Sequence, residues 1–545
     1  MCDQFFLRDV RRVFPIALLL CALLLLLAAC GGSTPNPIGI TPAARQVLTF
    51  PNVGTSDISV LDPAEGADSN SALAVDMLYS GLVRFDEHLN VSADQATWTI
   101  SPDRKTYTFT LKPGITFSDG TPLTARTYVY TLTRALAPGT RSPIATLFLG
   151  NILGAAAYNS GKASSLSGVQ ALDDTTLQIT LSRPTEYFLQ VMASSVAFAL
   201  NPQVIGRYGP GDWTNHVVGS GVGTGPFLVR TWDRQAKMVL APNPHYYGKK
   251  TRLSEVDMIF VNDPATAFKS YEAHQFDFAW NIAPPDLPVA RKLAGYTSQS
   301  LLETDMLFFD NTRPPFTNQA VRQAFASAIN KSLLVKAIFN NSVVAAPTII
   351  PPGMPGYQPG YPGLPFDVAR ARALFQSVYP DASKTPDITF TYPGSQVSSS
   401  LAQALQQMWQ TALGVQVHLQ SMDLTAYNNA TAVHQVQFGF TQWGADFPDP
   451  YDWLALNLLS TAPNNNGQWH NVQFDQTIAR AEDTSGQQRI ALYNQAEQIA
   501  ISSVGWLPLD HQAMSALIPS YMHGVSLSNT GLYFGDWSDV YLLQH

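Results

Sequence analysis

The chain has 545 residues, of which 46% are apolar and only 13% are charged, so it can bury the cores of several domains. Its 28 Phe, 21 Tyr and 10 Trp exclude a disordered or low-complexity protein. The net charge of −8 argues against a nucleic-acid binder that relies on a basic surface.

The first thirty residues have the order of an export signal. Arg8, Arg11 and Arg12 precede an uncharged apolar run over 13–29, which is typical of a secretory signal peptide. The run is near the lower length limit for spanning a membrane, so its length alone leaves a permanent anchor open. Its end resembles the lipobox of bacterial lipoproteins, Leu27-Ala28-Ala29-Cys30. That resemblance implies cleavage after residue 29, lipidation of Cys30, and a polar tether over 30–45.

The cysteines are consistent with this processing. Cys2 and Cys21 would leave with the signal, and Cys30 would carry the lipid. The mature chain would then hold no disulfide and no free thiol. This excludes a cysteine nucleophile, a thiolate zinc site and an iron–sulfur cluster.

Two kinds of apolar periodicity alternate along the mature chain. Alternation predicts half-buried strands at Tyr107, Phe109 and Leu111 and again at Leu177, Ile179 and Leu181. Helical spacing predicts helices over 318–339 behind a Thr317 cap, over 401–412 before Gly414, and over 487–502. A strand follows Gly414 at Val415, Val417 and Leu419. A helix that leads into a strand through one glycine indicates an α/β protein.

Motifs for catalysis and metal binding are missing from the sequence. There is no His-Glu-x-x-His, no Gly-x-Ser-x-Gly and no EF-hand loop. The glycine-rich segment 219–227 lacks the Gly-Lys-Ser/Thr ending of a phosphate loop, so we interpret it as backbone that needs positive φ or a close approach. A catalytic triad dispersed in the sequence stays open. We expect a protein that is not an enzyme and that needs no metal or cofactor.

The segment 442–451 stands out by its composition. It combines three aromatic residues, two acids and two prolines, Gln442-Trp443-Gly444-Ala445-Asp446-Phe447-Pro448-Asp449-Pro450-Tyr451. A carboxylate in a rigid aromatic loop can receive a cation such as a ligand ammonium. The alternative is that Trp443 and Phe447 belong to the core and that Asp446 caps a turn.

Further segments, in fixed order over most of the mature length, resemble a known family. They are Leu61-Asp62-Pro63, Leu78-Tyr79-Ser80-Gly81-Leu82, Tyr107-Thr108-Phe109, Phe117-Ser118-Asp119-Gly120-Thr121-Pro122-Leu123-Thr124-Ala125, Gly168-Val169-Gln170-Ala171, Asp174-Thr175-Thr176-Leu177, Gly223-Thr224-Gly225-Pro226-Phe227, Asn243-Pro244-His245-Tyr246-Tyr247, Pro315-Phe316 and Val321-Arg322-Gln323-Ala324. The chain thus resembles the extracellular solute-binding proteins of family 5, which serve bacterial ABC importers and bind oligopeptides, dipeptides or nickel.

This resemblance implies a periplasmic-binding-protein-like α/β fold with two main lobes, a hinge and an extra third lobe. The implied divisions are lobe I over 46–87, 201–303 and 515–545, lobe II over 88–200, and lobe III over 304–514. A ligand would lie between lobes I and III, which close around it on strands that cross near 303 and 515.

The resemblance also implies the ligand contacts. In peptide-binding members the acid of a Trp-x-x-Asp motif pairs with the ligand's α-ammonium, and here that motif is Trp443-Gly444-Ala445-Asp446. Backbone at Trp443 and Gly444 on one side and at Glu65-Gly66-Ala67 on the other would pair with an extended peptide. An oligopeptide-binding member has a basic residue where this chain has Phe440. The receptor for a ligand carboxylate is therefore unassigned, with Arg313 and Arg322 as guesses.

The expected function is capture of short peptides outside the membrane by a lipid-anchored monomer on the extracellular or periplasmic side. The implied partners are a permease and its ATPase subunits, and no nucleic acid. An oligosaccharide stacked on Trp443, Phe447 and Tyr451, or a metal chelate, is the alternative within the family. A secreted hydrolase is the alternative outside it.

Overall fold

The computed structural model describes residues 46–65 and 69–544. The apolar run 13–29, the tether 30–45, Cys30, Gly66 and Ala67 lie outside these ranges, so the predictions made on them stay predictions. Within the described ranges, no helix combines the length and the apolarity that a membrane crossing needs.

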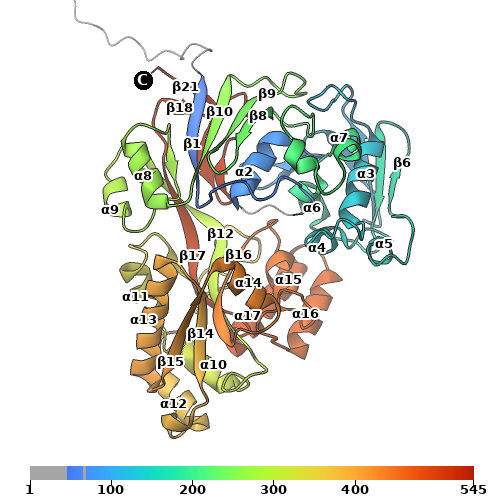
Figure 1. The fold of residues 1–545 in the computed structure, drawn as a ribbon. Coiled ribbons are helices and arrows are strands. Elements are labelled where there is room, and N and C mark those ends of the chain that lie inside the picture. The colour runs from blue at the N-terminus through green and yellow to red at the C-terminus, as the bar shows by residue number, and fades with distance from the viewer. Residues whose placement is uncertain (1–45, 66–68, 545) are drawn as a thin grey trace, which may run out of the picture.

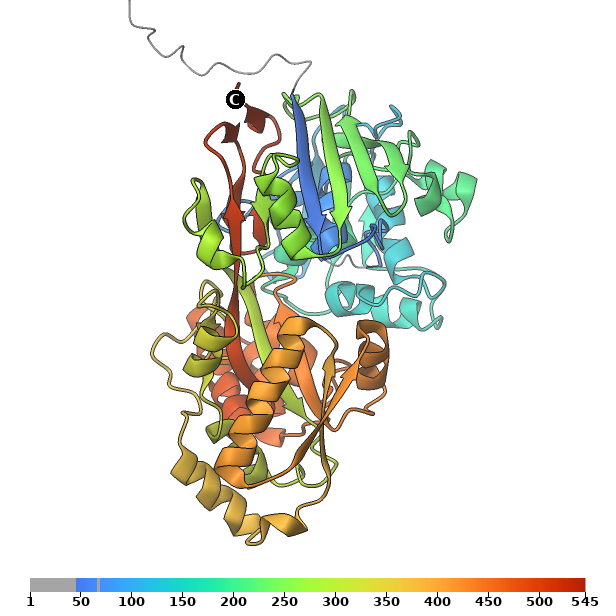
Figure 2. The same ribbon diagram turned by 60° about the vertical axis from the view of Figure 1, so that its left-hand side comes forward.

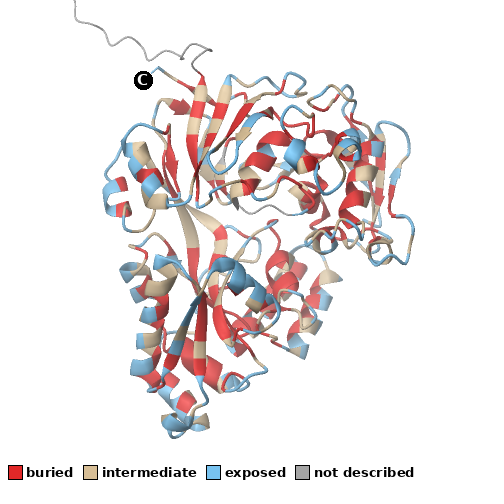
Figure 3. Cartoon of the chain, in the orientation of Figure 1, coloured by how far each residue is buried: buried red, intermediate tan, exposed pale blue. Residues whose placement is uncertain are grey.

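Three bodies, each built on its own sheet and core, make up the molecule, and we call them lobes I, II and III (Figure 1). Lobes I and II lie together in the upper part of the view, and lobe III lies below them. Figure 2 shows the same arrangement from the side. In each lobe the buried residues lie where the sheet and helices pack together (Figure 3), and most of these residues are apolar. The predicted α/β fold with three lobes is confirmed, whereas the exact boundaries between lobes stay a prediction. Elements are assigned to lobes by the core on which they pack, which places β2 (Val83–Phe85) with lobe II although it falls within the range predicted for lobe I.

Lobe I is built around a four-stranded sheet in the order β1-β10-β9-β8. Its elements are β1 (Val47–Val53), α2 (Ser69–Leu78), α7 (Pro202–Tyr208), η3 (Trp213–His216), β8 (Phe227–Asp233), β9 (Lys237–Pro242), β10 (Glu255–Val261), α8 (Pro264–Glu272), β11 (Ala279–Trp280), α9 (Leu287–Ala290), β18 (Met522–His523), β19 (Ser526–Ser528), β20 (Gly531–Tyr533) and β21 (Tyr541–Leu542). The glycines of segment 219–227 allow close packing on the end of α2: a Cβ at Gly223 would lie 2.0 Å from the carbonyl oxygen of Leu78. The segment is thus structural, as its sequence indicates.

Lobe II is built around a four-stranded sheet in the order β4-β5-β7-β6. Its elements are β2 (Val83–Phe85), β3 (Val91–Ala93), β4 (Ala96–Ile100), β5 (Thr106–Leu111), α3 (Ala125–Leu136), α4 (Ala145–Leu149), α5 (Ala155–Asn159), β6 (Val169–Ala171), β7 (Thr176–Thr180), α6 (Phe188–Met192) and η2 (Ser195–Ala197). Tyr107, Phe109 and Leu177 are buried on one face of β5 and β7, which confirms the alternation seen in the sequence.

Lobe III holds most of a seven-stranded sheet, β11-β17-β12-β16-β14-β15 with β13 beside β17. Its elements are β12 (Tyr296–Phe309), α10 (Gln319–Ser327), α11 (Lys331–Ala337), β13 (Val344–Ala345), α12 (Val368–Val378), η4 (Ala382–Lys384), β14 (Ile388–Pro393), α13 (Gln396–Leu413), β15 (Val417–Met422), α14 (Leu424–Ala432), β16 (Phe438–Gly444), η5 (Tyr451–Ala455, one π-helical turn), α15 (Leu456–Leu458), α16 (Val472–Glu482), α17 (Gly486–Ser503) and β17 (Leu507–Leu517).

The helix predicted over 318–339 is in fact two helices. Its cap is Asn318 rather than Thr317, because the Asn318 side chain accepts a hydrogen bond from the amide of Ala320 at 2.8 Å. A second cap, Asn330, starts α11 by accepting from the amide of Leu333 at 3.0 Å. The helix before Gly414 is confirmed, since Gly414 has φ of 71° and its amide bonds to the carbonyl of Gln410. Helix 487–502 is confirmed as α17.

The strands β12 and β17 connect lobe III with lobe I. They pair antiparallel and run through the waist of the molecule (Figure 1). The pairing is interrupted by register shifts between Ser300 and Thr304 and between Asp305 and Met306. Irregular pairing of this kind bends a strand, so the waist is the natural place for a hinge.

Candidate functional site

A cleft of about 710 Å³ lies where the three lobes meet. Lobe I contributes α2 and the segment 534–537, and lobe II contributes β2 and the segment 193–198. Lobe III contributes Leu302 and the segment 445–448, which follows β16. Aromatic side chains form much of the wall, among them Tyr79, Phe198, Tyr246, Trp280, Phe534 and Trp537. A largely preformed cavity with apolar walls and a few polar groups is the usual form of a small-ligand site.

Asp446 stands in this cleft on a loop that a second acid holds in place. The carboxylate of Asp452 accepts hydrogen bonds at 3.1 Å from both the indole nitrogen of Trp443 and the backbone amide of Asp446. Asp452 is fully buried in the π-helical turn that follows the loop. The loop conformation is therefore set from inside lobe III, and the carboxylate of Asp446 is left facing the cleft.

The two acids titrate together. Burial and the neighbouring charge of Asp446 raise the pKa of Asp452 well above its usual range. The Asp446 carboxylate is open to the cleft, but the enclosing walls limit its hydration and raise its pKa to about 6. Because Asp452 is fully buried and Asp446 opens to the cleft, the negative charge of the pair is favoured on Asp446. In the described part of the chain, no Lys, Arg or His forms an ion pair with Asp446, so its charge is available to a ligand.

A buried ion pair fixes the far end of the loop. The two terminal guanidinium nitrogens of Arg489 each donate to one carboxylate oxygen of Asp449 at 2.7 Å, and both side chains are buried. The same guanidinium contacts Glu482 at 3.1 Å. Bidentate pairs of this kind restrict both position and orientation. The segment 446–450 is therefore held at both ends, by Asp452 and by Arg489.

Phe447 crosses from lobe III into the core of lobe II. It is 1% exposed and belongs to the apolar cluster of lobe II. Its ring stacks on Tyr187 with centroids 5.2 Å apart and meets the edge of Phe148 at 5.6 Å. Tyr451 stacks on the same Tyr187 at 4.5 Å. Phe447 is covered by protein and Tyr451 is half-buried, which argues against a sugar stacked on both rings.

The other predicted contact residues divide into three groups. Glu65 and Ala445 line the cleft together with Asp446 and Phe447. Trp443 and Gly444 do not line it, and the Trp443 ring packs in lobe III with its nitrogen on Asp452. Gly66 and Ala67 lie outside the described residues.

The backbone of β16 has one edge open near the cleft. β12 pairs with β16 along its whole length, up to Gly444 opposite Glu303. On the other side β14 pairs only with Phe438 and Gly439. Among the described strands, none covers that second edge from Thr441 to Gly444, which leads directly into the cleft residue Ala445. Such an edge can take an added strand of ligand backbone.

The two arginines suggested for a ligand carboxylate have other partners. Arg313 forms an ion pair with Asp310 at 3.0 Å, and Arg322 donates to the carbonyls of Phe316 and Ser503. Neither lines the cleft. Arg84 on β2 does line it, and no sequence motif marks this residue. Asp452 was also missed, although it continues the three-residue spacing of Asp446 and Asp449.

The cleft as a whole is acidic. Among its described residues Arg84 is the only Lys or Arg. Six carboxylates line the cleft, those of Glu65, Asp76, Asp86, Asp94, Asp446 and Asp536. Desolvation raises the pKa of Asp76 to about 7. Burial also raises the pKa of Glu65, with the charge of Asp62 adding to the effect. A ligand that brings positive charge is therefore favoured over an anionic one.

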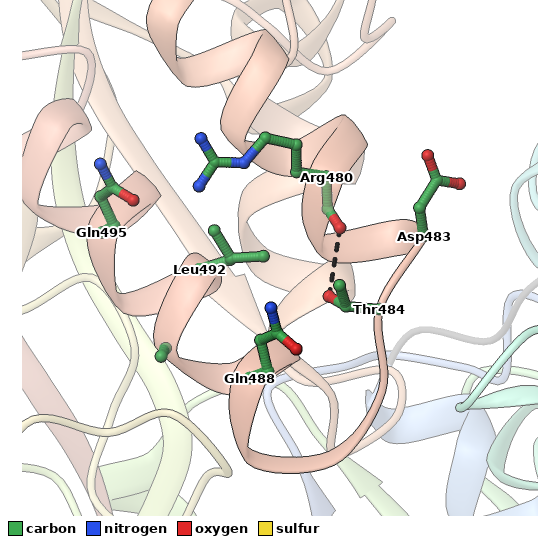
Figure 4. A pocket seen from close by; sticks show the side chains of 7 residues that line it. Arg480, Asp483, Thr484, Gln488, Leu492 and Gln495 are labelled. Atoms are coloured by element: carbon green, nitrogen blue, oxygen red, sulfur yellow. Dashed lines mark hydrogen bonds between the residues drawn. The ribbon is translucent and has the colours of Figure 1, made fainter.

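Two other hollows differ from this cleft. One of about 370 Å³ lies on α16 and α17 and shares no residue with the cleft; its wall includes Arg480 and Thr484, whose hydroxyl donates to the Arg480 carbonyl at 3.1 Å (Figure 4). The other, of about 510 Å³, adjoins the cleft through Leu89, Pro448 and Ser528. The described residues include no group of three or more His, Cys, Asp or Glu side chains placed to hold a metal ion.

The geometry can be set beside known proteins. Residues 93–465 match the model of the family described as Bacterial extracellular solute-binding proteins, family 5 Middle. The chain is 27% identical to the oligopeptide-binding protein OppA of Bacillus subtilis over 96% of this chain and 99% of that protein. It is 30% identical to the probable deoxycholate-binding periplasmic protein YgiS of Escherichia coli over 93% of this chain and 96% of that one.

A solved structure has the same fold. The murein tripeptide binding protein MppA of Escherichia coli superposes with a TM-score of 0.80 and 26% identity. The match covers 92% of this chain and 99% of MppA. Near-complete coverage in both directions means that lobes I, II and III all have counterparts there.

Proposed function

Since this chain belongs to the bacterial extracellular solute-binding proteins of family 5, we propose that it captures short peptides with a free α-amino group and delivers them to an ABC permease and its ATPase subunits. The protein does so as a binding protein without turnover. A lipid at Cys30 anchors it to the membrane on the extracellular or periplasmic side, where it works as a monomer.

One observation carries the peptide proposal. Asp446 lines the interlobe cleft, and no Lys, Arg or His among the described residues forms an ion pair with it. A ligand α-ammonium would provide the missing positive charge in a charge-assisted hydrogen bond worth about 1.5–3 kcal/mol. Two relatives point the same way, since the printed names of OppA and MppA refer to oligopeptides and a murein tripeptide.

The backbone contacts follow from the same geometry. Ligand main chain would pair with the open edge of Thr441–Gly444 and reach the cleft beside Ala445. Glu65, with Gly66 and Ala67 next to it in sequence, would face the ligand from lobe I. Main-chain hydrogen bonds give affinity that does not depend on the ligand's side chains, so the site can accept peptides of varied sequence.

Deoxycholate, named for the relative YgiS, is the informative rival ligand. It is an anion, and the six carboxylates of the cleft would repel it. The peptide proposal therefore predicts that tripeptides stabilise this protein and that deoxycholate does not.

A thermal unfolding experiment with purified full-length protein tests the proposal. A mixture of free tripeptides should raise the melting temperature, because a ligand at a hundredfold excess over Kd stabilises the folded state by about 2.7 kcal/mol. N-acetylated tripeptides should raise it much less, and the peptides should be recovered intact. Stabilisation by deoxycholate alone would overturn the peptide proposal, and hydrolysis of the peptides would indicate an enzyme.

A further inference from the structure

Arg84 occupies a distinctive place in the cleft. It lies at the centre of β2, opposite Ser92 of β3, and its neighbours Val83 and Phe85 pack on the core of lobe II. The Arg84 side chain is exposed and lines the cleft. Of the described residues along the cleft, it is the only one with a permanent positive charge.

The guanidinium of Arg84 is not used by the protein. It forms no ion pair with any residue in 46–65 or 69–544, although the charge of Asp94 lies within electrostatic reach. Asp94 instead accepts a hydrogen bond from the Tyr247 hydroxyl at 2.6 Å. Asp536 accepts from the backbone amide of Ser538 at 3.0 Å.

The charge of Arg84 acts on Asp94. Burial raises the pKa of Asp94, and the hydrogen bond from Tyr247 and the charge of Arg84 oppose that rise. The Arg84 charge likewise opposes the rise in the pKa of Tyr246, which burial and the charges of Asp94 and Asp536 bring to about 12. Arg84 thus lies among acidic residues of the cleft, and no described residue accepts a hydrogen bond from its guanidinium.

A peptide ligand has one charge that the rest of the cleft cannot accept. Its carboxylate is repelled by six acids, and only a fixed cation can offset that repulsion. Arg313 and Arg322 are engaged away from the cleft. We propose that Arg84 binds the C-terminal carboxylate of the ligand, while Asp446 binds its α-ammonium at the other end.

This inference rests on the proposed function and adds the direction in which the ligand lies. The α-amino end would sit on the loop of lobe III and the carboxylate end on β2 of lobe II. A guanidinium can donate two parallel hydrogen bonds to a carboxylate, which a lysine cannot do. A short peptide held at both ends would also bridge the loop of lobe III and β2.

Calorimetry on full-length protein tests the inference with tripeptides that end in a free carboxylate or in an amide. Amidation should weaken binding to the wild type about tenfold or more, as should Arg84→Gln for the free acid. The two losses should not add, because both remove one interaction. Arg84→Lys should recover part of the affinity.

Arg207→Gln is the matched control, because Arg207 is exposed on α7 and lies outside the cleft. It should bind both peptides as the wild type does, and the unliganded melting temperature of Arg84→Gln should match the wild type. Equal wild-type affinity for acid and amide would overturn the inference, and so would an undiminished amide effect in Arg84→Gln. In either case a loss on N-acetylation would leave the proposed function standing. Failure of every free tripeptide to bind would overturn both.

Discussion

Phe447 of lobe III stacks on Tyr187 of lobe II, with ring centroids 5.2 Å apart and planes inclined by 16°. Phe447 directly follows Asp446, so the residue that faces the ligand and the residue that joins the lobes are neighbours in the chain. The ion pair between Arg183 and Glu482, at 3.1 Å, adds a second link between lobes II and III. The position of the ligand-facing carboxylate thus depends on contact between lobes.

Phe447→Ala should therefore affect both stability and binding. Removing a fully buried phenylalanine costs about 3–5 kcal/mol of unfolding free energy, and here the cavity would open between two lobes. Peptide affinity should fall as well, since the loop with Asp446 loses an anchor. Denaturant unfolding and calorimetry measure the two effects. Phe366→Ala, at a side chain that is 50% exposed, should change either quantity little, and equal behaviour of the two variants would refute the role of Phe447.

The ion pair between Arg489 and Asp449 should contribute strongly to the free energy of unfolding, because it holds the loop in place. Arg489→Met leaves a buried carboxylate without its partner, so the free energy of unfolding should fall by about 3–5 kcal/mol. Arg126→Met is the control, because Arg126 and Asp174 pair at 3.6 Å on the surface, with side chains 81% and 74% exposed. That change should cost about 0–1 kcal/mol. Similar losses from both variants in urea unfolding would contradict the importance given to the buried pair.

Peptide affinity should decrease in acid. In the proposed function the ligand ammonium binds the ionised form of Asp446, whose pKa the cleft walls raise to about 6. Lowering the pH from 7 to 5 protonates most of this carboxylate, so the association constant should fall about tenfold. Calorimetry at both pH values measures the change. In Asp446→Asn the affinity should be lower and nearly constant over this range, and a wild-type affinity that does not change with pH would rule out this assignment.

The hinge strands should make the protein more stable in mild acid. Asp305 on β12 lies opposite Asp510 on β17, and the Gln512 amide donates to both carboxylates at 2.8 and 2.7 Å. Burial raises the pKa of Asp305 to about 7 and the pKa of Asp510 well above its usual range, with the charge of Asp305 adding to the latter. The folded state therefore holds protons that the unfolded state releases near pH 4, and unfolding free energy should fall as the pH rises from about 4 to 7.

Asp305→Asn tests this sign, because an amide resembles the protonated acid. It should stabilise the protein by about 1–2 kcal/mol at pH 8 and hardly at all at pH 4.5. Asp387→Asn, on the surface of lobe III, should leave the pH dependence of stability unchanged. Thermal unfolding of the three proteins at both pH values is the measurement. A wild type that becomes more stable between pH 4.5 and 8 would contradict the effect ascribed to the hinge.

The acidic cleft should also select among peptides. Ala-Lys-Ala should bind more tightly than Ala-Glu-Ala, by about tenfold at low ionic strength, because six carboxylates face a single arginine. High salt should narrow the difference by screening the charges. Titrations at two salt concentrations measure it. A preference for the glutamate peptide would contradict selection of the ligand by the acidic residues of the cleft.

Local patterns in the sequence predicted the elements well. The alternation at Tyr107, Phe109 and Leu111 depends only on which face of a strand is buried, and β5 follows it. The stop at Gly414 depends on a left-handed residue after a helix, and α13 follows it. The split between α10 and α11 was missed because the cap at Asn330 lies within a continuous helical periodicity.

The site was only partly predictable because its geometry depends on residues distant in sequence. Composition marked the loop around Asp446, but its supports include Arg489 and Tyr187, and only the fold brings them to it. The burial of Phe447 could not be foreseen, since its partners belong to another lobe. Arg84 lies in an ordinary strand, and only the fold brings it to the cleft, where it is the single Lys or Arg among the described residues.

The central claim is that Asp446 receives the α-ammonium of a peptide. Calorimetry on wild type and Asp446→Asn, each with one tripeptide in free and N-acetylated form, tests it most directly. Either change alone should reduce affinity about a hundredfold or more. Asp446→Asn leaves the ligand ammonium without its partner, and N-acetylation leaves the Asp446 carboxylate without its partner. Both together should reduce it little further. Equal affinity of the wild type for the free and the acetylated peptide would contradict the claim.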